Sequence, residues 1–129
     1  MIPCPDRATP VAAPVFAGEM CSYALDVWLT PADVLSDPDR LVATMRAAAA
    51  AGHAAVLDES VHVFPNGAVT AVLLLSQSHL SVHTWPELGM ANFDLLTCGR
   101  LNGELILAQL RADLVPVRAN VTRVIRDVF

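Results

Sequence analysis

The stretch AVTAVLLLSQSHLSVHTWPE, residues 68–87, contains the two neighbouring strands on which our fold prediction for this chain rests. Its first part, Ala68–Leu75, is an almost continuous aliphatic run, as expected of a buried central strand. Its second part, Ser78–Trp85, alternates along its length, which is typical of a strand with one buried face, and Pro86 ends it.

The other elements are predicted outward from this stretch. Pro65-Asn66-Gly67 is a turn signal between two apolar runs and predicts a hairpin. Asp37-Pro38 begins a helix with proline at its first position, and Gly52 ends it. The remaining predictions are strands at Ser22–Leu29, Ala54–Phe64, Ala91–Thr97 and Val117–Val128, and a second, amphipathic helix at Leu101–Leu114.

Strands linked by hairpins, together with two helices, predict an α+β fold. We expect a two-layer α/β sandwich with a mainly antiparallel sheet and two helices on one face. Residues 18–129 are predicted to form this single domain. Residues 1–17 hold four of the nine prolines and are predicted to be a flexible N-terminal arm.

Composition and charge exclude several classes of function. The chain has 129 residues, of which 54% are hydrophobic and 16% charged, so it can build one real core. Its net charge of -5 argues against nucleic acid and anionic membranes as partners and suits a small cationic substrate. All eight basic residues are arginine, which excludes a P-loop and a lysine-anchored pyridoxal phosphate (PLP) cofactor.

The cysteines and the first residues of the chain indicate the cellular compartment in which we expect the protein. Cys4, Cys21 and Cys98 are odd in number and widely spaced, which argues against a disulfide framework or a zinc ribbon. The first residues carry no basic region followed by an apolar one, so we expect no signal peptide. The clean apolar runs are too short to span a bilayer. These features predict a cytoplasmic protein.

Reactive side chains concentrate between Ser76 and Gly99, and several kinds of chemistry compete there. His79 and His83 share one face of the predicted strand but lie about 13 Å apart, too far for one ion, so we expect no metal. A serine or cysteine hydrolase lacks its usual G-x-S-x-G elbow or papain-type context. A purely structural role, with each hydroxyl and imidazole bonded locally, also stays open.

The sequence S-Q-S-H-L-S-V-H-T-W-P-E at 76–87, followed by D-L-L-T-C-G at 94–99, closely resembles the core of the small prokaryotic S-adenosylmethionine decarboxylases. V-H-V-F-P-N-G-A-V-T at 61–70 extends the resemblance upstream. The resemblance implies self-cleavage between Gln77 and Ser78, which turns Ser78 into a covalent pyruvoyl group. That carbonyl is an electron sink for decarboxylation that needs no lysine.

The resemblance also implies roles for individual residues. His83 would assist the β-elimination that completes maturation, and Thr70 would aid processing. Cys98 would be the general acid that reprotonates the product carbon. The implied substrate-binding residues are Phe64 stacked on the adenine, Glu87 on the ribose hydroxyls, and Trp85 packed beside the pocket. For Phe64 and Trp85 a plain core role stays open.

The resemblance leaves several questions open. Gln77 stands where the family has glutamate, and strand alternation puts Ser78 on the face opposite His83. Alternatives are a pyruvoyl-dependent decarboxylase of ornithine or arginine, or an unprocessed, non-catalytic relative. For the former, the acidic candidates for a second cationic group are Asp26, Asp58 and Glu59. The resemblance further implies a homo-oligomer, at least an (αβ)₂ dimer, with residues of two protomers at each site.

Overall fold

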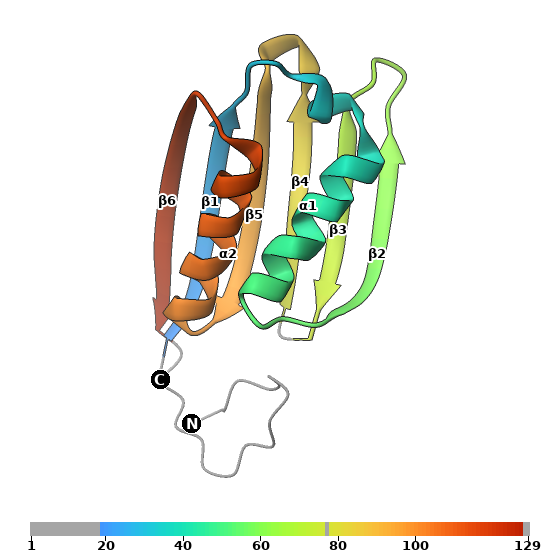
Figure 1. Ribbon diagram of the computed structural model, residues 1–129. Coiled ribbons are helices and arrows are strands. Elements are labelled where there is room, and N and C mark those ends of the chain that lie inside the picture. Colours follow the sequence, from blue (N-terminus) through green and yellow to red (C-terminus); the bar gives the residue numbers. More distant parts are fainter. Residues whose placement is uncertain (1–18, 77, 128–129) are drawn as a thin grey trace.

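The computed structural model describes residues 19–76 and 78–127. Two helices pack on one face of a single six-stranded sheet (Figure 1). The strands are β1 (Glu19–Trp28), β2 (Val56–Val63), β3 (Val69–Leu75), β4 (Ser78–Trp85), β5 (Met90–Cys98) and β6 (Arg118–Asp127). The helices are α1 (Pro38–Ala51) and α2 (Arg100–Leu114), with short 3-10 helices η1 (Asp33–Ser36) and η2 (Pro86–Leu88). The predicted arm, residues 1–17, lies outside the described residues.

The sheet has the order β2-β3-β4-β5-β1-β6, and every neighbouring pair is antiparallel. Strands β2 to β5 follow one another as hairpins, whereas β1 is inserted between β5 and β6. The predicted α+β sandwich and its order of elements are confirmed. The two 3-10 helices were not predicted, because each is only three or four residues long and carries no periodic pattern.

The core lies between the helices and the sheet. Alternate residues of each inner strand point to this side, as in β3, where Val69, Ala71, Leu73 and Leu75 are buried. Helix α2 packs closely on β1 at Gly103, where an added Cβ would lie 2.3 Å from the Tyr23 ring. A side chain at residue 103 would therefore push α2 away from the sheet.

The loop that leads into α1 is held to the sheet by one buried threonine. Thr84 Oγ1 accepts a hydrogen bond from the Val69 N–H and donates one to the Leu35 carbonyl, both at 2.8 Å. Helix α1 then begins at Pro38, where the Asp37 side chain accepts a hydrogen bond from the Arg40 N–H at 3.2 Å. Thr84 thus links η1, β3 and β4, and it lies in β4 between His83 and Trp85, two of the predicted site residues.

The face of the sheet opposite the helices, which we call the open face, carries the strand residues that point away from the core. Within the described ranges no helix covers it, as Figure 1 shows. Its residues in β3 and β4 are half-buried or exposed: Thr70, Val72, Leu74, His79, Ser81, His83 and Trp85. Neither described helix is long and apolar enough to cross a membrane.

Candidate active site

A row of polar side chains crosses the open face from one edge of the sheet to the other. The register aligns one residue from each strand, and we call this set the polar row: His62, Thr70, His83, Asn92, Asp26 and Asn120. Neighbouring side chains in such a row lie about 5 Å apart, close enough to interact. Two of the predicted processing residues, Thr70 and His83, are therefore cross-strand partners.

His83 is held in one orientation by its neighbours. Its Nδ1 lies 2.7 Å from the Thr70 Oγ1. Its ring lies edge-to-face with Trp85 at 4.5 Å and with Phe64 at 5.7 Å between centroids. In the tautomer with its proton on Nδ1, His83 donates a hydrogen bond to the Thr70 hydroxyl, and its Nε2 is left as a base. The site therefore places one imidazole between two aromatic walls on an accessible surface.

Asn92 joins the tryptophan to an acidic group. The Trp85 Nε1–H donates to the Asn92 Oδ1, and the Asn92 Nδ2 donates to the Asp26 Oδ1, each at 2.7 Å. Both side-chain groups of the amide are thus used, which fixes the Trp85 indole and leaves a carboxylate on the same face as His83. From the sequence, Asp26 was predicted only as a candidate for binding a cation, and Asn92 was not predicted.

The predicted cleavage point lies at the other end of β4. Ser78 is the first residue of this strand and pairs with Leu75, the last residue of β3, so β3 and β4 form a hairpin. The Ser78 Oγ lies 3.2 Å from the Nδ1 of His79. Gln77, the residue before the predicted cut, lies outside the described residues.

Cys98 belongs to the same end of the sheet as Ser78. It is the last residue of β5, and the pairing of His79 with Leu96 brings the start of β4 beside the end of β5. Cys98 is buried, and its sulfur is disulfide-bonded in this structure, which the cysteine spacing did not predict. Cys21 is a free, buried cysteine.

The structure divides the predicted residues into two groups. Ser78 and His83 are five residues apart along β4, which corresponds to roughly 16 Å and to opposite faces of the sheet. Phe64, Trp85 and the exposed Glu87, in η2, lie toward the His83 end. The opposite placement of Ser78 and His83 that alternation predicts is confirmed. A single chain does not bring its cleavage point to its predicted binding residues.

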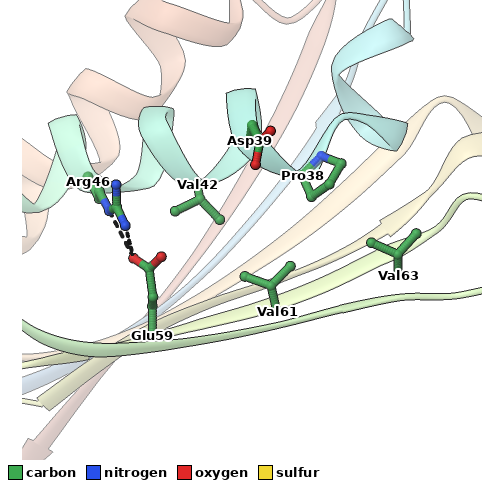
Figure 2. Close-up of a pocket in the computed structure, with 7 residues that line it drawn as sticks. All are labelled: Pro38, Asp39, Val42, Arg46, Glu59, Val61 and Val63. Atoms are coloured by element: carbon green, nitrogen blue, oxygen red, sulfur yellow. Dashed lines mark hydrogen bonds and ion pairs between the residues drawn. The ribbon is translucent and has the colours of Figure 1, made fainter.

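A groove on the helix side of the sheet contains none of the residues predicted for processing, catalysis or nucleoside binding. It has a volume of about 450 Å³ and runs between α1 and β2, with Val42, Val61 and Val63 along it (Figure 2). Glu59, one of the acidic candidates, forms an ion pair with Arg46 there. Its charge is therefore already neutralised, and it faces away from the polar row.

The metal alternative has no cluster of ligands in this structure. Among residues 19–76 and 78–127, no three His, Cys, Asp or Glu side chains gather closely enough to hold an ion. His79 and His83 lie on one strand as predicted. His83 has its Nδ1 on Thr70, and His79 has its Nδ1 near Ser78.

Known proteins match this chain in sequence and in fold. A family model described as S-adenosylmethionine decarboxylase matches residues 22–127. The S-adenosylmethionine decarboxylase proenzyme of Brevibacillus brevis is 36% identical over 104 residues, which cover 80% of this chain and 78% of that protein. The proenzyme of Thermomicrobium roseum is 43% identical over 87 residues, covering 66% of this chain and 75% of that protein.

A solved structure shares the fold. The adenosylmethionine decarboxylase of Aquifex aeolicus aligns with a TM-score of 0.79 over 87% of this chain and 93% of that chain, at 23% sequence identity. The family model spans the sheet from β1 to β6, and with it both ends of β4. The chain belongs to the S-adenosylmethionine decarboxylase family.

Proposed function

We propose that this chain is a proenzyme that cleaves itself before Ser78 and then decarboxylates S-adenosylmethionine. The observation that carries the proposal is the pairing of His83 with Thr70 between two aromatic rings, at the positions that the family resemblance assigns to processing and binding. Relatives named as proenzymes support the maturation step.

In the proposed maturation, the Ser78 hydroxyl attacks the Gln77 carbonyl carbon and an ester replaces the peptide bond. His83 then removes the proton from the Ser78 Cα, the Cβ–Oγ bond breaks, and Gln77 leaves as a carboxylate. The elimination leaves a dehydroalanine at position 78. Water then hydrolyses its imine form, so that oxygen replaces the nitrogen and the nitrogen departs as ammonia. The products are chains 1–77 and 78–129, the second beginning with a pyruvoyl group.

The pyruvoyl carbonyl supplies an electron sink for the carbanion left when carbon dioxide departs. Cys98 would donate the proton that this carbon then takes up, because it lies at the Ser78 end of the sheet. This acid is the thiol released by reduction of the Cys98 disulfide. A reducing cytoplasm, which keeps such thiols available, is therefore the proposed location.

The binding residues lie at the other end of β4. Phe64 is 37% exposed and Trp85 39%, so both present ring surface on which an adenine stacks. The exposed carboxylate of Glu87 is able to accept hydrogen bonds from two ribose hydroxyls. Asp26 adds a negative charge on the open face that suits a cationic substrate.

The distance between the two ends supports a site built by two copies of the chain. The cleavage end and the His83 end lie roughly 16 Å apart on one chain, whereas the chemistry needs them in contact. Two copies packed through their sheets with their β4 strands in opposite directions bring the start of β4 in one copy, and with it the cleavage point, beside the His83 end of β4 in the other. We therefore propose a homodimer, (αβ)₂ after cleavage.

Co-production of two inactive variants tests this arrangement. A Ser78→Ala chain keeps its His83, and a His83→Ala chain keeps its Ser78. If the site is shared, the mixture contains dimers in which the His83→Ala chain is cleaved and gains a pyruvoyl terminus, visible by intact mass. Cleavage of neither chain in demonstrated mixed dimers would contradict the shared site.

Intact mass under denaturing conditions, followed by a decarboxylation assay, tests the function itself. We expect two chains that meet between Gln77 and Ser78, and release of carbon dioxide from S-adenosylmethionine in the presence of a reductant. A cleaved enzyme that acts on ornithine or arginine instead would favour the alternative for which Asp26 provides the carboxylate on the polar row. An uncut chain without turnover would indicate a non-catalytic relative.

A further inference from the structure

Ser78, the serine at the proposed cleavage point, contacts a histidine other than His83. The Ser78 Oγ lies 3.2 Å from the Nδ1 of His79, within hydrogen-bonding distance. His83, to which the resemblance assigns processing, lies roughly 16 Å further along β4 with its Nδ1 on Thr70. Within one chain, the Ser78 hydroxyl proton is therefore within reach of His79 and out of reach of that chain's own His83.

We infer that His79 is the base that takes the Ser78 hydroxyl proton in the first step of self-cleavage, which leaves the β-elimination to His83. This inference rests on the proposed function. As the Ser78 Oγ bonds to the Gln77 carbonyl carbon, its proton passes to the His79 Nδ1. The C–N bond before Ser78 then breaks, and the same proton passes from His79 to the Ser78 nitrogen. An ester and a free amine result, with no other reactant.

The surrounding backbone keeps the two side chains in place. The Ser76 N–H donates to the Ala55 carbonyl at 2.8 Å, and the Ala55 N–H donates to the Ser76 Oγ at 3.3 Å. His79 itself is paired on both sides, with Leu74 in β3 and Leu96 in β5. A nucleophile and a base held at contact distance before reaction avoid most of the entropic cost of bringing them together.

The position of His79 makes the inference testable by chemical rescue. Its side chain is exposed in the single chain, so a small base from solution is able to enter the space left by its removal. Loss of a positioned base costs typically 10²–10⁴-fold in rate. His79→Ala and His83→Ala are matched variants, because each removes one imidazole from the same face of the same strand.

The experiment follows cleavage of freshly synthesised chains by intact mass, with and without hydroxylamine, which cuts esters. We expect His83→Ala to accumulate the ester, so that hydroxylamine releases a second chain beginning with serine. We expect His79→Ala and His79→Gln to stay whole with hydroxylamine, at least 100-fold slower than the wild type. Added imidazole should restore ester formation in His79→Ala, which a misfolded chain would not show.

The outcomes separate the two proposals. A wild-type chain that is cut, together with His79→Ala or His79→Gln cut at the same rate, would overturn the role of His79 and leave the proposed function intact. Hydroxylamine cleavage of the unrescued His79→Ala chain would also overturn it, because the ester would have formed without the base. A wild-type chain that stays whole would overturn the proposed function, and this inference with it.

Discussion

The two ends of β4 are built in different ways. At its beginning, Ser78 meets the next residue in the chain, so the contact is local and rests on one pair of atoms. At its end, His83 is held by Thr70 of β3 and by two aromatic rings, one from β4 and one from the turn after β2. Changes at the first end should therefore abolish processing outright, whereas changes at the second end should slow it by degrees.

The largest effect is expected for Ser78→Ala. Without the hydroxyl no ester forms and no pyruvoyl group arises, so cleavage and decarboxylation are both lost completely. Intact mass should show one chain, and circular dichroism an unchanged fold, because Ser78 is a partly exposed residue at the edge of a turn. A cut chain from this variant would place the reactive serine elsewhere.

Thr70→Val tests the second end, at His83. It removes the 2.7 Å contact that orients His83 and should slow the completion of processing about tenfold to a hundredfold. Thr70→Ser keeps the hydroxyl and should process at nearly the wild-type rate. Time courses of cleavage measure both. Equal rates for the valine and serine variants would show that the hydroxyl does not orient the imidazole.

Thr84→Val tests how much the buried Thr84, next to His83 in β4, contributes to the stability of the fold. The variant leaves the buried Val69 N–H and Leu35 carbonyl without their partner, which should lower the free energy of unfolding by about 1–3 kcal/mol. Thr84→Ser keeps both hydrogen bonds and should lose less. Urea unfolding of the uncut Ser78→Ala background measures each. Identical stability of the two variants would show that the Thr84 hydrogen bonds to Val69 and Leu35 do not stabilise the fold.

Asn92→Ala should weaken substrate binding rather than maturation. It frees the Trp85 indole and the Asp26 carboxylate, which Asn92 joins at 2.7 Å on each side. We expect KM to rise about tenfold, equivalent to about 1.4 kcal/mol, with cleavage of the chain unchanged. A fall in kcat at constant KM would instead place Asn92 in the chemical step.

The smallest effect is expected far from β4, at the Arg123–Glu104 ion pair between β6 and α2. The hydrogen bond from Arg123 lowers the pKa of Glu104. Because the folded pKa is lowered, the stabilisation is present above the ordinary pKa of a glutamate and is lost as the pH falls through the folded value. The pair is about half exposed, so solvent screens it and Arg123→Gln should lower the stability only slightly near neutral pH.

Thermal unfolding across pH measures this prediction. The difference between Arg123→Gln and the wild type should shrink toward zero in acid, while cleavage is the same in both chains. A difference that grows as the pH falls would have the wrong sign for a carboxylate with a lowered pKa.

Much of the fold could be predicted because the strands β2 to β5 are consecutive hairpins. The strand over Ser78–Trp85 was predicted with its observed bounds, and the helices to within a residue or so. Part of the polar row could also be predicted from the sequence, because residues placed symmetrically about a tight turn pair with each other. His62 and Thr70 pair across the turn at Asn66, and Thr70 and His83 across the turn after Leu75.

The rest could not be predicted from local patterns. Asp26 joins the row only because β1 is inserted between β5 and β6, a long-range pairing that no turn specifies. Asn92 is one polar residue in an alternating strand, and its two hydrogen bonds depend on that pairing. The local contact of Ser78 with His79 depends on a side-chain orientation at the strand start, which alternation alone does not specify.

The insertion of β1 has a consequence for the cleaved protein. The first product chain would contribute β1, β2 and β3, and the second β4, β5 and β6. Since β1 has a strand of the second chain on each side, and β4 pairs with β3, the two polypeptides are interlocked along three strand boundaries. They should stay associated without a covalent link, yet unfolding would separate them. Refolding of the mature form would then be bimolecular and dependent on concentration, unlike that of the intact chain.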